Sequence, residues 1–420
     1  MESLRKSILV DGFHLQMSLE KSVGSFVFDE LSGRKLLDFY TSFASCPIGY
    51  NHPQLTLDRL VFPNKIANSD IYTAEYVDFV EAFRETIPEE LRTHLFFVEG
   101  GSAAVENGLK AAFDWKIQKS TVAENDLKVI HFVEAFHGRT GYTLSLTNTD
   151  PIKTVGFPKF SWPRCINPKL HYRCGLIDNL LEVVEQENLA IDQVMEALKL
   201  FPGQIAALII EPIQSEGGDN HFRPEFLYRL RKLADKYEFL LIFDEVQTGF
   251  GATGKMWCCQ HAGILPDILV FGKKTQVCGI AASRRLDEVQ SVFSVSSRIN
   301  STWGGNLVDM VRCTQIIRVY HRQGVVENAE RVGRYLLDGL IELERRGSPI
   351  SNCRGLGMLL AFDLSDGDVR DQFMKDSYAE GLICLKCGPR SIRFRPPLNL
   401  SISEADLGLS IITRVLAKLH

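Results

Sequence analysis

Short, nearly uninterrupted apolar runs alternate with amphipathic stretches through the middle of the chain. The runs have strand length, are rich in branched and aromatic residues, and end at Gly, Pro or acidic residues. They are 95–98, 129–133, 205–211, 239–244 and 268–271. Between them apolar residues recur at helical spacing, as over 103–118 and 224–237. This alternation predicts an α/β fold with a mostly parallel central sheet that is covered on both faces.

The two ends of the chain depart from this pattern. Near the start, residues 25–28 and 35–39 flank a Ser-Gly turn, which predicts two short strands. Beyond about Leu307 a long helical stretch runs through Leu343, followed by mixed short elements and an amphipathic helix from Glu404. We therefore predict an N-terminal segment that packs with a small domain, a large domain, and a smaller α/β C-terminal domain. Their bounds are 1–60, 61–306 and 307–420.

Composition and charge narrow the class of protein. The chain has 420 residues, of which 45% are hydrophobic and 24% charged, and its net charge is −5. A nucleic-acid binder or a polybasic membrane-surface protein would show a basic excess. No apolar run approaches the roughly 20 residues that a membrane span needs, and the N-terminus lacks the apolar core of a signal peptide. We expect a cytoplasmic protein with neither nucleic-acid nor membrane partners.

The ten cysteines do not form a recognisable framework. They are scattered along a large chain, which favours reduced thiols over disulfides. Cys384 and Cys387 form a CxxC pair, but no second pair or matching histidines lie nearby to complete a zinc site. We expect no metal.

Candidate chemistry gathers just after the predicted strands, where ligands bind in open parallel sheets. These segments hold one Gly-rich turn, two carboxylates, an aromatic residue and a lysine. They are 99–102, 134–137, 211–214, 244–247 and 272–274. Each feature alone has an ordinary structural explanation, so a functional interpretation depends on all of them occurring together.

Three of these features suit a phosphorylated, carbonyl-bearing cofactor. Gly100-Gly101-Ser102 opens a helix whose first N–H groups could bind an anion, or Ser102 is simply an N-cap. Asp244 ends an apolar run, so its carboxylate needs a cationic partner such as a protonated pyridine nitrogen or a basic side chain. Lys273 would attack a carbonyl if desolvated, and its neighbour Lys274 competes for that role.

A dinucleotide-binding motif is also present. Gly249, Gly251 and Gly254 fit G-x-G-x-x-G. That motif should follow its strand directly and open a helix, whereas Asp244-Glu-Val-Gln-Thr248 separates the apolar residues 239–243 from these glycines. We therefore give it little weight.

In chain order the turn, the aromatic residue, the strand-end carboxylate and the lysine meet the needs of pyridoxal 5'-phosphate. Phe243-Asp-Glu-Val-Gln-Thr-Gly249 and the later Pro266-Asp-Ile-Leu-Val-Phe-Gly-Lys273 resemble the signature of the class III aminotransferases, which have the fold type I of pyridoxal-phosphate enzymes. Further segments resemble the lysine ε-aminotransferases of that family more than those acting on ornithine or 4-aminobutyrate. They are 96–101, 111–116, 135–139, 145–149, 272–279 and 300–305.

The resemblance implies which residues hold the cofactor. Lys273 would carry it, and Asp244 would bind its ring nitrogen. Gly101 and Ser102 would bind the phosphate, and Phe136 would stack on the ring with His137 beside it. Gln247 would contact the ring hydroxyl. Thr302 would reach the phosphate from the partner subunit of a homodimer with shared active sites. Ser102 departs from the alanine that is typical of close relatives, but a backbone contact survives that change.

The resemblance also implies the substrates, L-lysine and 2-oxoglutarate, with 2-aminoadipate 6-semialdehyde and glutamate as products. Arg139 would hold the distal carboxylate of either substrate. Arg393 would pair with the 2-oxoglutarate carboxylate beside the keto carbon and be masked by Glu216 while lysine reacts. Arg395 is the rival of Arg393. Two further candidates for substrate binding have structural alternatives, namely Glu211 in a hydrogen-bond network and Asn300 in a turn.

Three other functions stay open at this point. Within the same fold, a 4-aminobutyrate or ornithine aminotransferase would share the cofactor but prefer another amine. An NAD-dependent oxidoreductase would rest on the Gly249 motif. A non-catalytic protein would bind the cofactor and leave it unchanged when an amine is added.

Overall fold

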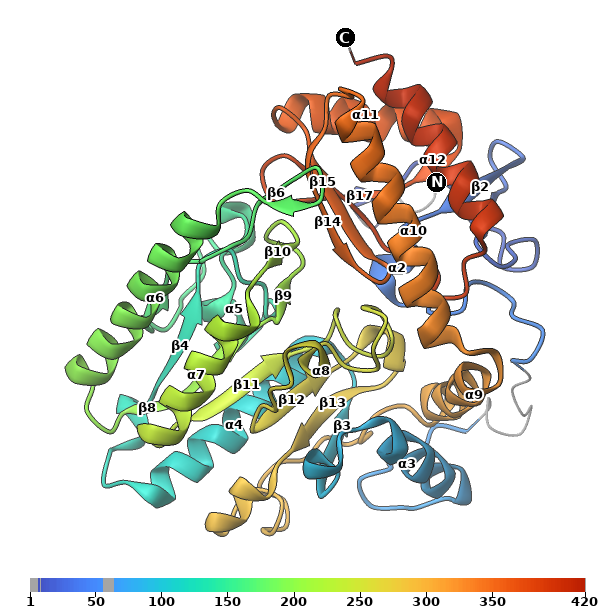
Figure 1. Ribbon diagram of the computed structural model, residues 1–420. Coiled ribbons are helices and arrows are strands. Elements are labelled where there is room, and N and C mark those ends of the chain that lie inside the picture. The colour runs from blue at the N-terminus through green and yellow to red at the C-terminus, as the bar shows by residue number, and fades with distance from the viewer. Residues whose placement is uncertain (1–6, 8, 56–63, 420) are drawn as a thin grey trace.

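The computed structural model describes residue 7, residues 9–55 and residues 64–419. A seven-stranded sheet forms its centre (Figure 1), in the order β3-β13-β12-β11-β8-β4-β5. Only β13 runs antiparallel to its neighbours, and the other adjacent pairs are parallel, which confirms the predicted mostly parallel sheet. The strands are β3 (His94–Val98), β4 (Lys128–Phe132), β5 (Arg164–Cys165), β8 (Ile205–Ile210), β11 (Leu240–Asp244), β12 (Ile268–Phe271) and β13 (Cys278–Ala282).

The five predicted apolar runs are all strands because both faces of this sheet are buried. On one face Leu208 and Leu241 join the cluster that includes helix α7 (Pro224–Lys236). On the other, Ile209 and Ile242 pack with helix α4 (Gly101–Lys119). Alternate residues of each strand thus enter different cores, so neither face leaves room for a polar position. Pro224 occupies the first turn of α7, where proline is favoured.

The sequence pattern missed strand β13. Its sequence, Cys-Gly-Ile-Ala-Ala, is dominated by small residues that are poor strand formers in isolation. The packing explains their presence, since a Cβ atom on Gly279 would lie 2.1 Å from the carbonyl oxygen of Phe96 on β3. Tertiary contacts across the sheet, rather than local preference, make this segment a strand.

A second, four-stranded antiparallel sheet is built from the C-terminal part of the chain, in the order β14-β15-β18-β17. Helices α10, α11 and α12 pack with its strands or with one another. The elements are β14 (Ser351–Leu356), β15 (Leu359–Asp363), α11 (Gly367–Glu380), β17 (Leu385–Cys387), β18 (Ser391–Phe394) and α12 (Ile402–Leu416).

The N-terminal segment is tied to this C-terminal part. Strands β1 (Phe26–Asp29) and β2 (Arg34–Asp38) form the predicted hairpin, and β2 also pairs in parallel with β16 (Leu382–Ile383). Figure 1 shows β2 beside the C-terminal helix α12. The pairing joins the first segment to the C-terminal part of the chain. The division into domains stays a prediction, and its boundary at residues 60–61 lies outside the described residues.

The long helical stretch after Leu307 is two helices, not one. Helix α9 (Leu307–Gln323) ends at Gly324, which has the left-handed φ of 59°, and α10 (Val325–Arg345) starts at the next residue. Helix α9 packs against α3 (Ala74–Thr86), whereas α10 packs on β14 and α12. The glycine therefore separates helices that belong to different layers.

The remaining elements are short, except for one long helix on the flank of the central sheet. They are α2 (Thr41–Ala44), α5 (Gly141–Leu146), β6 (Tyr172–Arg173), β7 (Leu176–Ile177), α6 (Leu180–Leu200), β9 (Ile213–Gln214), β10 (Asn220–His221), α8 (Cys259–Ala262), and 3-10 turns at Glu89–Leu91, Glu124–Asp126, Pro151–Lys153, Lys273–Thr275 and Arg284–Glu288. Of the helices in the described ranges, none combines the length and apolarity needed to cross a membrane.

Candidate active site

The carboxyl ends of β3, β4, β8, β11 and β12 lie on one edge of the central sheet, because these strands run in the same direction. The residues that follow them therefore converge, as expected for a parallel sheet. The structure brings together Gly101, Ser102, Phe136, His137, Arg139, Glu211, Glu216, Asp244, Gln247, Lys273 and Arg393 at or near this edge.

Lys273 has the surroundings of a reactive amine. It follows Gly272 directly after β12, and its backbone has the left-handed φ of 56°. Burial, joined by the nearby Arg393, lowers the pKa of Lys273 to about 8 although Glu216 and Asp244 oppose the shift. Within the described part of the chain its ammonium makes no hydrogen bond. A lysine held this way has a sizeable neutral, nucleophilic fraction near neutral pH.

Lys274 lies in different surroundings. Its side chain is buried, and Nζ donates a hydrogen bond of 3.3 Å to the backbone carbonyl of Gln247. That contact fixes the amine inside the protein. Of the two adjacent lysines, Lys273 has no such hydrogen bond of its amine among the described residues, which favours it as the candidate.

Asp244 ends β11 as a buried carboxylate with two partners. Its Oδ2 lies 2.8 Å from Nδ1 of His137, and its Oδ1 accepts a hydrogen bond from the Val246 amide. The Nε2 atom of His137 is buried without a partner among the described residues. The contact with His137 thus holds the Asp244 carboxylate at the end of β11, where it could accept a hydrogen bond from a ring N–H group of a ligand.

The N-terminus of α4 is open for an anion. Its N-cap residue, Gly100, has φ 96°, a Cβ atom there would meet nothing within 4 Å, and no side chain of the described residues caps the helix. The first amides of this 19-residue helix are therefore free to bind a phosphate.

The Ser102 side chain turns away from this opening. Its hydroxyl lies 2.8 Å from both Thr140 Oγ1 and Thr143 Oγ1, and it accepts a 3.3 Å hydrogen bond from the Arg139 amide. The residue that departs from the family pattern therefore links the start of α4 to the loop that carries Arg139.

Phe136 lies between cations and a carboxylate. The guanidinium of Arg139 lies 5.9 Å and the ammonium of Lys153 5.2 Å from its ring centre. Its amide donates to Oε1 of Glu211, whose Oε2 accepts from the Ser215 amide. Burial raises the pKa of Glu211 to about 7 despite the opposing His137. Glu211 thus holds two backbone segments together, as in the structural alternative.

Glu216 is shared by two cations. Its Oε2 lies 2.5 Å from the guanidinium of Arg393, and its Oε1 lies 2.9 Å from Nζ of Lys153. Burial opposes ionisation, but these two cations outweigh it and lower the pKa of Glu216 to about 2. The carboxylate stays ionised at physiological pH and covers the Arg393 side chain.

Arg395 is held in place by a different carboxylate. Its two terminal nitrogens pair with both oxygens of Asp219, at 2.9 and 2.5 Å, and its Nε donates to Oε1 of Gln247. Arg393 donates to the same Gln247 oxygen at 3.3 Å. Both oxygens of Asp219 thus bind Arg395, whereas Glu216 is shared between Arg393 and Lys153.

Two predicted residues lie elsewhere in this chain. Asn300 and Thr302 are exposed, and the Thr302 carbonyl accepts a hydrogen bond from Ser69. Among the described contacts neither residue touches the group around Lys273. Their predicted roles require a partner subunit.

The sequence reasoning missed two residues that the geometry brings out. Lys153 is the second cation on Glu216, and Asp219 decides which arginine is fixed. Neither ends a predicted strand, which was the signal used. The chain separation of Arg395 and Asp219 leaves no local pattern that could have paired them.

A family model for class III aminotransferases matches residues 10–416. The chain belongs to the class III aminotransferase family. An L-lysine-epsilon aminotransferase of Amycolatopsis lactamdurans is 45% identical over 430 residues, which cover 99% of this chain and 95% of that protein. The L-lysine-epsilon aminotransferase of Mycobacterium tuberculosis is 45% identical over 428 residues, with 99% and 94% covered. The solved structure of a lysine aminotransferase from M. tuberculosis in the internal aldimine form has a TM-score of 0.95 at 44% identity, covering 100% of this chain and 98% of that one.

The residues of this aminotransferase fit pyridoxal phosphate, the cofactor of its family. The open start of α4 offers amides to a phosphate, and Asp244 offers a buried carboxylate to the ring nitrogen. Phe136 presents a ring face, and Lys273 an amine with a lowered pKa. The chemistry of the donor set matches each part of the cofactor.

The dinucleotide motif has a structural role in the aminotransferase. A Cβ atom on Gly251 would lie 3.1 to 3.3 Å from the side chains of Leu398, Tyr320 and Val326, and one on Gly254 would lie 2.8 Å from Glu330. These glycines form a turn packed against the C-terminal part and do not open a helix. The oxidoreductase hypothesis loses its basis.

Proposed function

We propose that this aminotransferase transfers the ε-amino group of L-lysine to 2-oxoglutarate, giving 2-aminoadipate 6-semialdehyde and glutamate. The observation that carries the proposal is the Arg393–Glu216 pair, backed by Lys153, at the edge that also holds Lys273 and Asp244. The relatives named for this reaction, which align over almost the full chain, support it.

When bound, pyridoxal phosphate supplies an aldehyde that links to amines and a ring that withdraws electrons from the adjacent carbon. The chain would hold it through the α4 amides, the ring of Phe136 and the carboxylate of Asp244. Asp244 keeps the ring nitrogen protonated because a buried carboxylate favours a cation beside it. His137 orients Asp244 through its 2.8 Å contact.

Lys273 has two tasks in this proposal. Its amine would hold the cofactor, and in its neutral form it would accept the proton from the carbon that bears the substrate nitrogen. The pKa of about 8 keeps part of the amine neutral at pH 7. Burial of the site keeps water from competing for that proton.

Charge selects the substrates. Arg139, exposed at the mouth of the site, would bind the distal carboxylate of either substrate. Lysine presents only methylenes to Arg393, so Glu216 stays on that arginine while lysine reacts. The second carboxylate of 2-oxoglutarate then replaces Glu216, which keeps an ion pair with Lys153 when it leaves. 2-Oxoglutarate can therefore bind to Arg393 while the negative charge of Glu216 remains paired with Lys153.

The enzyme would act as a homodimer with shared active sites. Large apolar side chains are exposed over residues 152–160, namely Ile152, Val155, Phe157 and Phe160, and others are exposed at Ile71 and Tyr72. Exposed apolar side chains in such number are typical of a protein interface. Thr302 and Asn300 are exposed and would complete the partner's site. The free thiols of all ten cysteines support a location in the cytoplasm.

The decisive experiment compares amine donors on the purified holoenzyme. With 2-oxoglutarate as acceptor, glutamate formation should be fastest per mole of enzyme with L-lysine, and slower with ornithine or 4-aminobutyrate. A Lys273→Ala variant should lose the activity. A holoenzyme that forms glutamate from 4-aminobutyrate or ornithine but not from L-lysine would refute the substrate assignment.

A further inference from the structure

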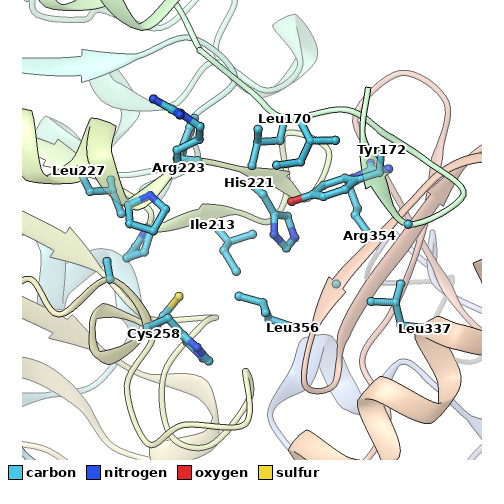
Figure 2. Close-up of a pocket in the computed structure, with 18 of the residues that line it drawn as sticks. Leu170, Tyr172, Ile213, His221, Arg223, Leu227, Cys258, Leu337, Arg354 and Leu356 are labelled. Carbon is cyan, nitrogen blue, oxygen red and sulfur yellow. The ribbon is translucent and has the colours of Figure 1, made fainter. Parts of the chain in front are cut away.

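A second hollow lies away from the candidate active site. It has a volume of about 450 Å³ and lies between the β9–β10 hairpin, the starts of α6 and α7, helix α10 and strand β14 (Figure 2). We call it the hairpin cavity. None of the predicted active-site residues lines it, so the proposed reaction does not explain it.

The walls of the hairpin cavity are mainly apolar. Leu170, Ile213 and Leu356 face the hollow in Figure 2, and Leu337 contributes from α10. Its size lies within the range of roughly 300 to 1,000 Å³ that is typical of small-molecule sites. An apolar hollow of this size gains free energy when an apolar group displaces its water.

Two polar groups in this apolar wall lack partners. His221 is 6% exposed, its ring projects into the hollow, and its nitrogens make no hydrogen bond within the described ranges. The hydroxyl of Tyr172, whose ring lies 6.2 Å from that imidazole, is likewise without a protein partner among the described residues. Both groups border the open space of the hollow, where the polar group of a ligand would pair with them.

The charges around the cavity are already neutralised. Arg354 pairs with Asp363 at 2.9 Å, and Arg223 pairs with Glu187 at 2.8 Å. Burial, together with Arg354 and other nearby cations, lowers the pKa of His221 to about 4 and outweighs Asp219, so the imidazole is neutral at pH 7. No unpaired charge among the described residues would attract an ion, which favours an uncharged ligand.

The cavity wall is continuous with the Glu216 turn. Ile213 and His221 face each other in the hairpin register, and the turn between them carries Glu216 and Asp219. Arg354, another wall residue, donates to the carbonyls of Gly218 and Asp219 at 2.5 and 2.9 Å. A ligand that moves the hairpin or Arg354 would therefore shift the turn that covers Arg393.

We propose that the hairpin cavity binds a small uncharged molecule with an apolar body and one hydrogen-bonding group, and that its occupancy alters the pairing of Glu216 with Arg393. The second half of this proposal rests on the proposed function, because it assumes that 2-oxoglutarate displaces Glu216.

Binding is tested first, on the holoenzyme, by calorimetric titration with phenol, indole and benzoate. Phenol and indole should bind, and the carboxylate of benzoate should weaken binding. Leu356→Phe, which fills the hollow, should raise the dissociation constant at least about tenfold. His221→Phe keeps a ring but removes the hydrogen bond and should weaken phenol about three- to tenfold. Leu181→Phe on exposed helix α6 is the matched control and should change nothing.

Equal affinity of all variants for phenol would overturn the site, and benzoate binding that Leu356→Phe weakens as much as phenol binding would overturn the preference for an uncharged ligand. Thermal unfolding of each variant separates loss of the cavity from loss of the fold. These measurements do not depend on catalysis, so they stand even if the proposed reaction is wrong.

Communication with the active site is tested separately. A saturating probe should change the KM for 2-oxoglutarate at least about threefold and the KM for L-lysine much less, and the change should vanish in Leu356→Phe. If the probe binds but both KM values stay unchanged, the proposed effect of the cavity on Glu216 is refuted, whereas the binding site itself is retained. An enzyme without lysine-dependent activity would instead refute the proposed function.

Discussion

Lys273 and Lys274 are neighbours in the sequence but have different surroundings. No spacing rule separates them, because both follow the same strand. The separation comes from the backbone turn at Gly272 and Lys273, which leaves one amine near Asp244 and Glu216 and directs the other to the Gln247 carbonyl. The same limit applies to Arg393 and Arg395, whose difference depends on Asp219 from a distant loop.

The lysine pair can be tested by spectroscopy. Lys273→Ala should abolish the visible absorption band of covalently held cofactor, whereas Lys274→Gln should retain it, because the Lys274 amine donates to the backbone carbonyl of Gln247. The reverse result would exchange the two roles.

The lowered pKa of Lys273 predicts a pH dependence. Only the neutral amine captures an aldehyde, and with a pKa of about 8 roughly a tenth is neutral at pH 7, against roughly one part in three thousand for an ordinary lysine. The rate at which cofactor-free protein captures pyridoxal phosphate should rise about tenfold per pH unit below pH 8 and level off above it. A rate that keeps rising to pH 10 would contradict the shift. Stopped-flow absorbance gives this rate.

Removing the mask on Arg393 should alter the two half-reactions in opposite directions. Glu216→Gln leaves Arg393 uncovered, so catalytic efficiency with L-lysine should fall about tenfold or more, while the KM for 2-oxoglutarate should fall. Single-turnover kinetics with each substrate measures both. Glu342→Gln, on an exposed helical ion pair, is the control and should leave both unchanged. Equal losses in both half-reactions would argue against a mask.

Arg395 should behave as a structural residue. Its buried bidentate pair with Asp219 predicts that Arg395→Met costs about 3 to 5 kcal/mol of unfolding free energy, because Asp219 is left buried and unpaired. Arg393→Met should instead raise the KM for 2-oxoglutarate with a smaller stability loss, since Glu216 keeps Lys153. Urea unfolding and steady-state kinetics on both variants distinguish them.

At the scale of elements, the sequence predicts what local patterns determine. The fully buried strands read as continuous apolar runs, so β3, β4, β8, β11 and β12 were found. Strand β13 was missed because its residues are small, which allows close approach to β3 but gives no run of branched or aromatic residues in the sequence. The break between α9 and α10 was missed because a single glycine in an amphipathic stretch is also compatible with one helix.

The helix break gives a stability prediction. Gly324→Ala places a Cβ atom on a residue with φ 59°, which should lower the unfolding free energy by about 1 kcal/mol. The added atom meets nothing closer than a Glu327 oxygen at 3.4 Å, so the cost is conformational and not steric. Gly12→Ala, where nothing lies within 4 Å and no positive φ occurs, is the control and should be neutral. Equal unfolding midpoints in urea would contradict the assignment.

At the scale of the whole molecule, the proposed site would be completed by a second copy of the chain. Asn300 and Thr302 lie apart from Lys273, and no sequence signal assigns them to a partner except the family resemblance. Their exposure, together with the apolar segment around Phe157, is the physical reason to expect a dimer.

Subunit mixing tests this arrangement. Lys273→Ala and a bulky Thr302→Trp variant should each be inactive as homodimers. After joint unfolding and refolding, mixed dimers should regain one intact site, giving about a quarter of the wild-type activity if subunits pair at random. Activity that stays at zero, with dimers verified by light scattering, would argue that each chain completes its own site.

Burial in the fold makes the reactivity of Lys273 a property of the folded chain. An unfolded chain presents all its lysines with similar ordinary pKa values, whereas burial beside Arg393 lowers the pKa of Lys273 to about 8. Limited labelling with an amine reagent near that pH should therefore mark Lys273 in native, cofactor-free molecules and no single lysine in denatured ones. The extent of labelling at this one position would then count correctly folded molecules in a preparation, without any assay of turnover.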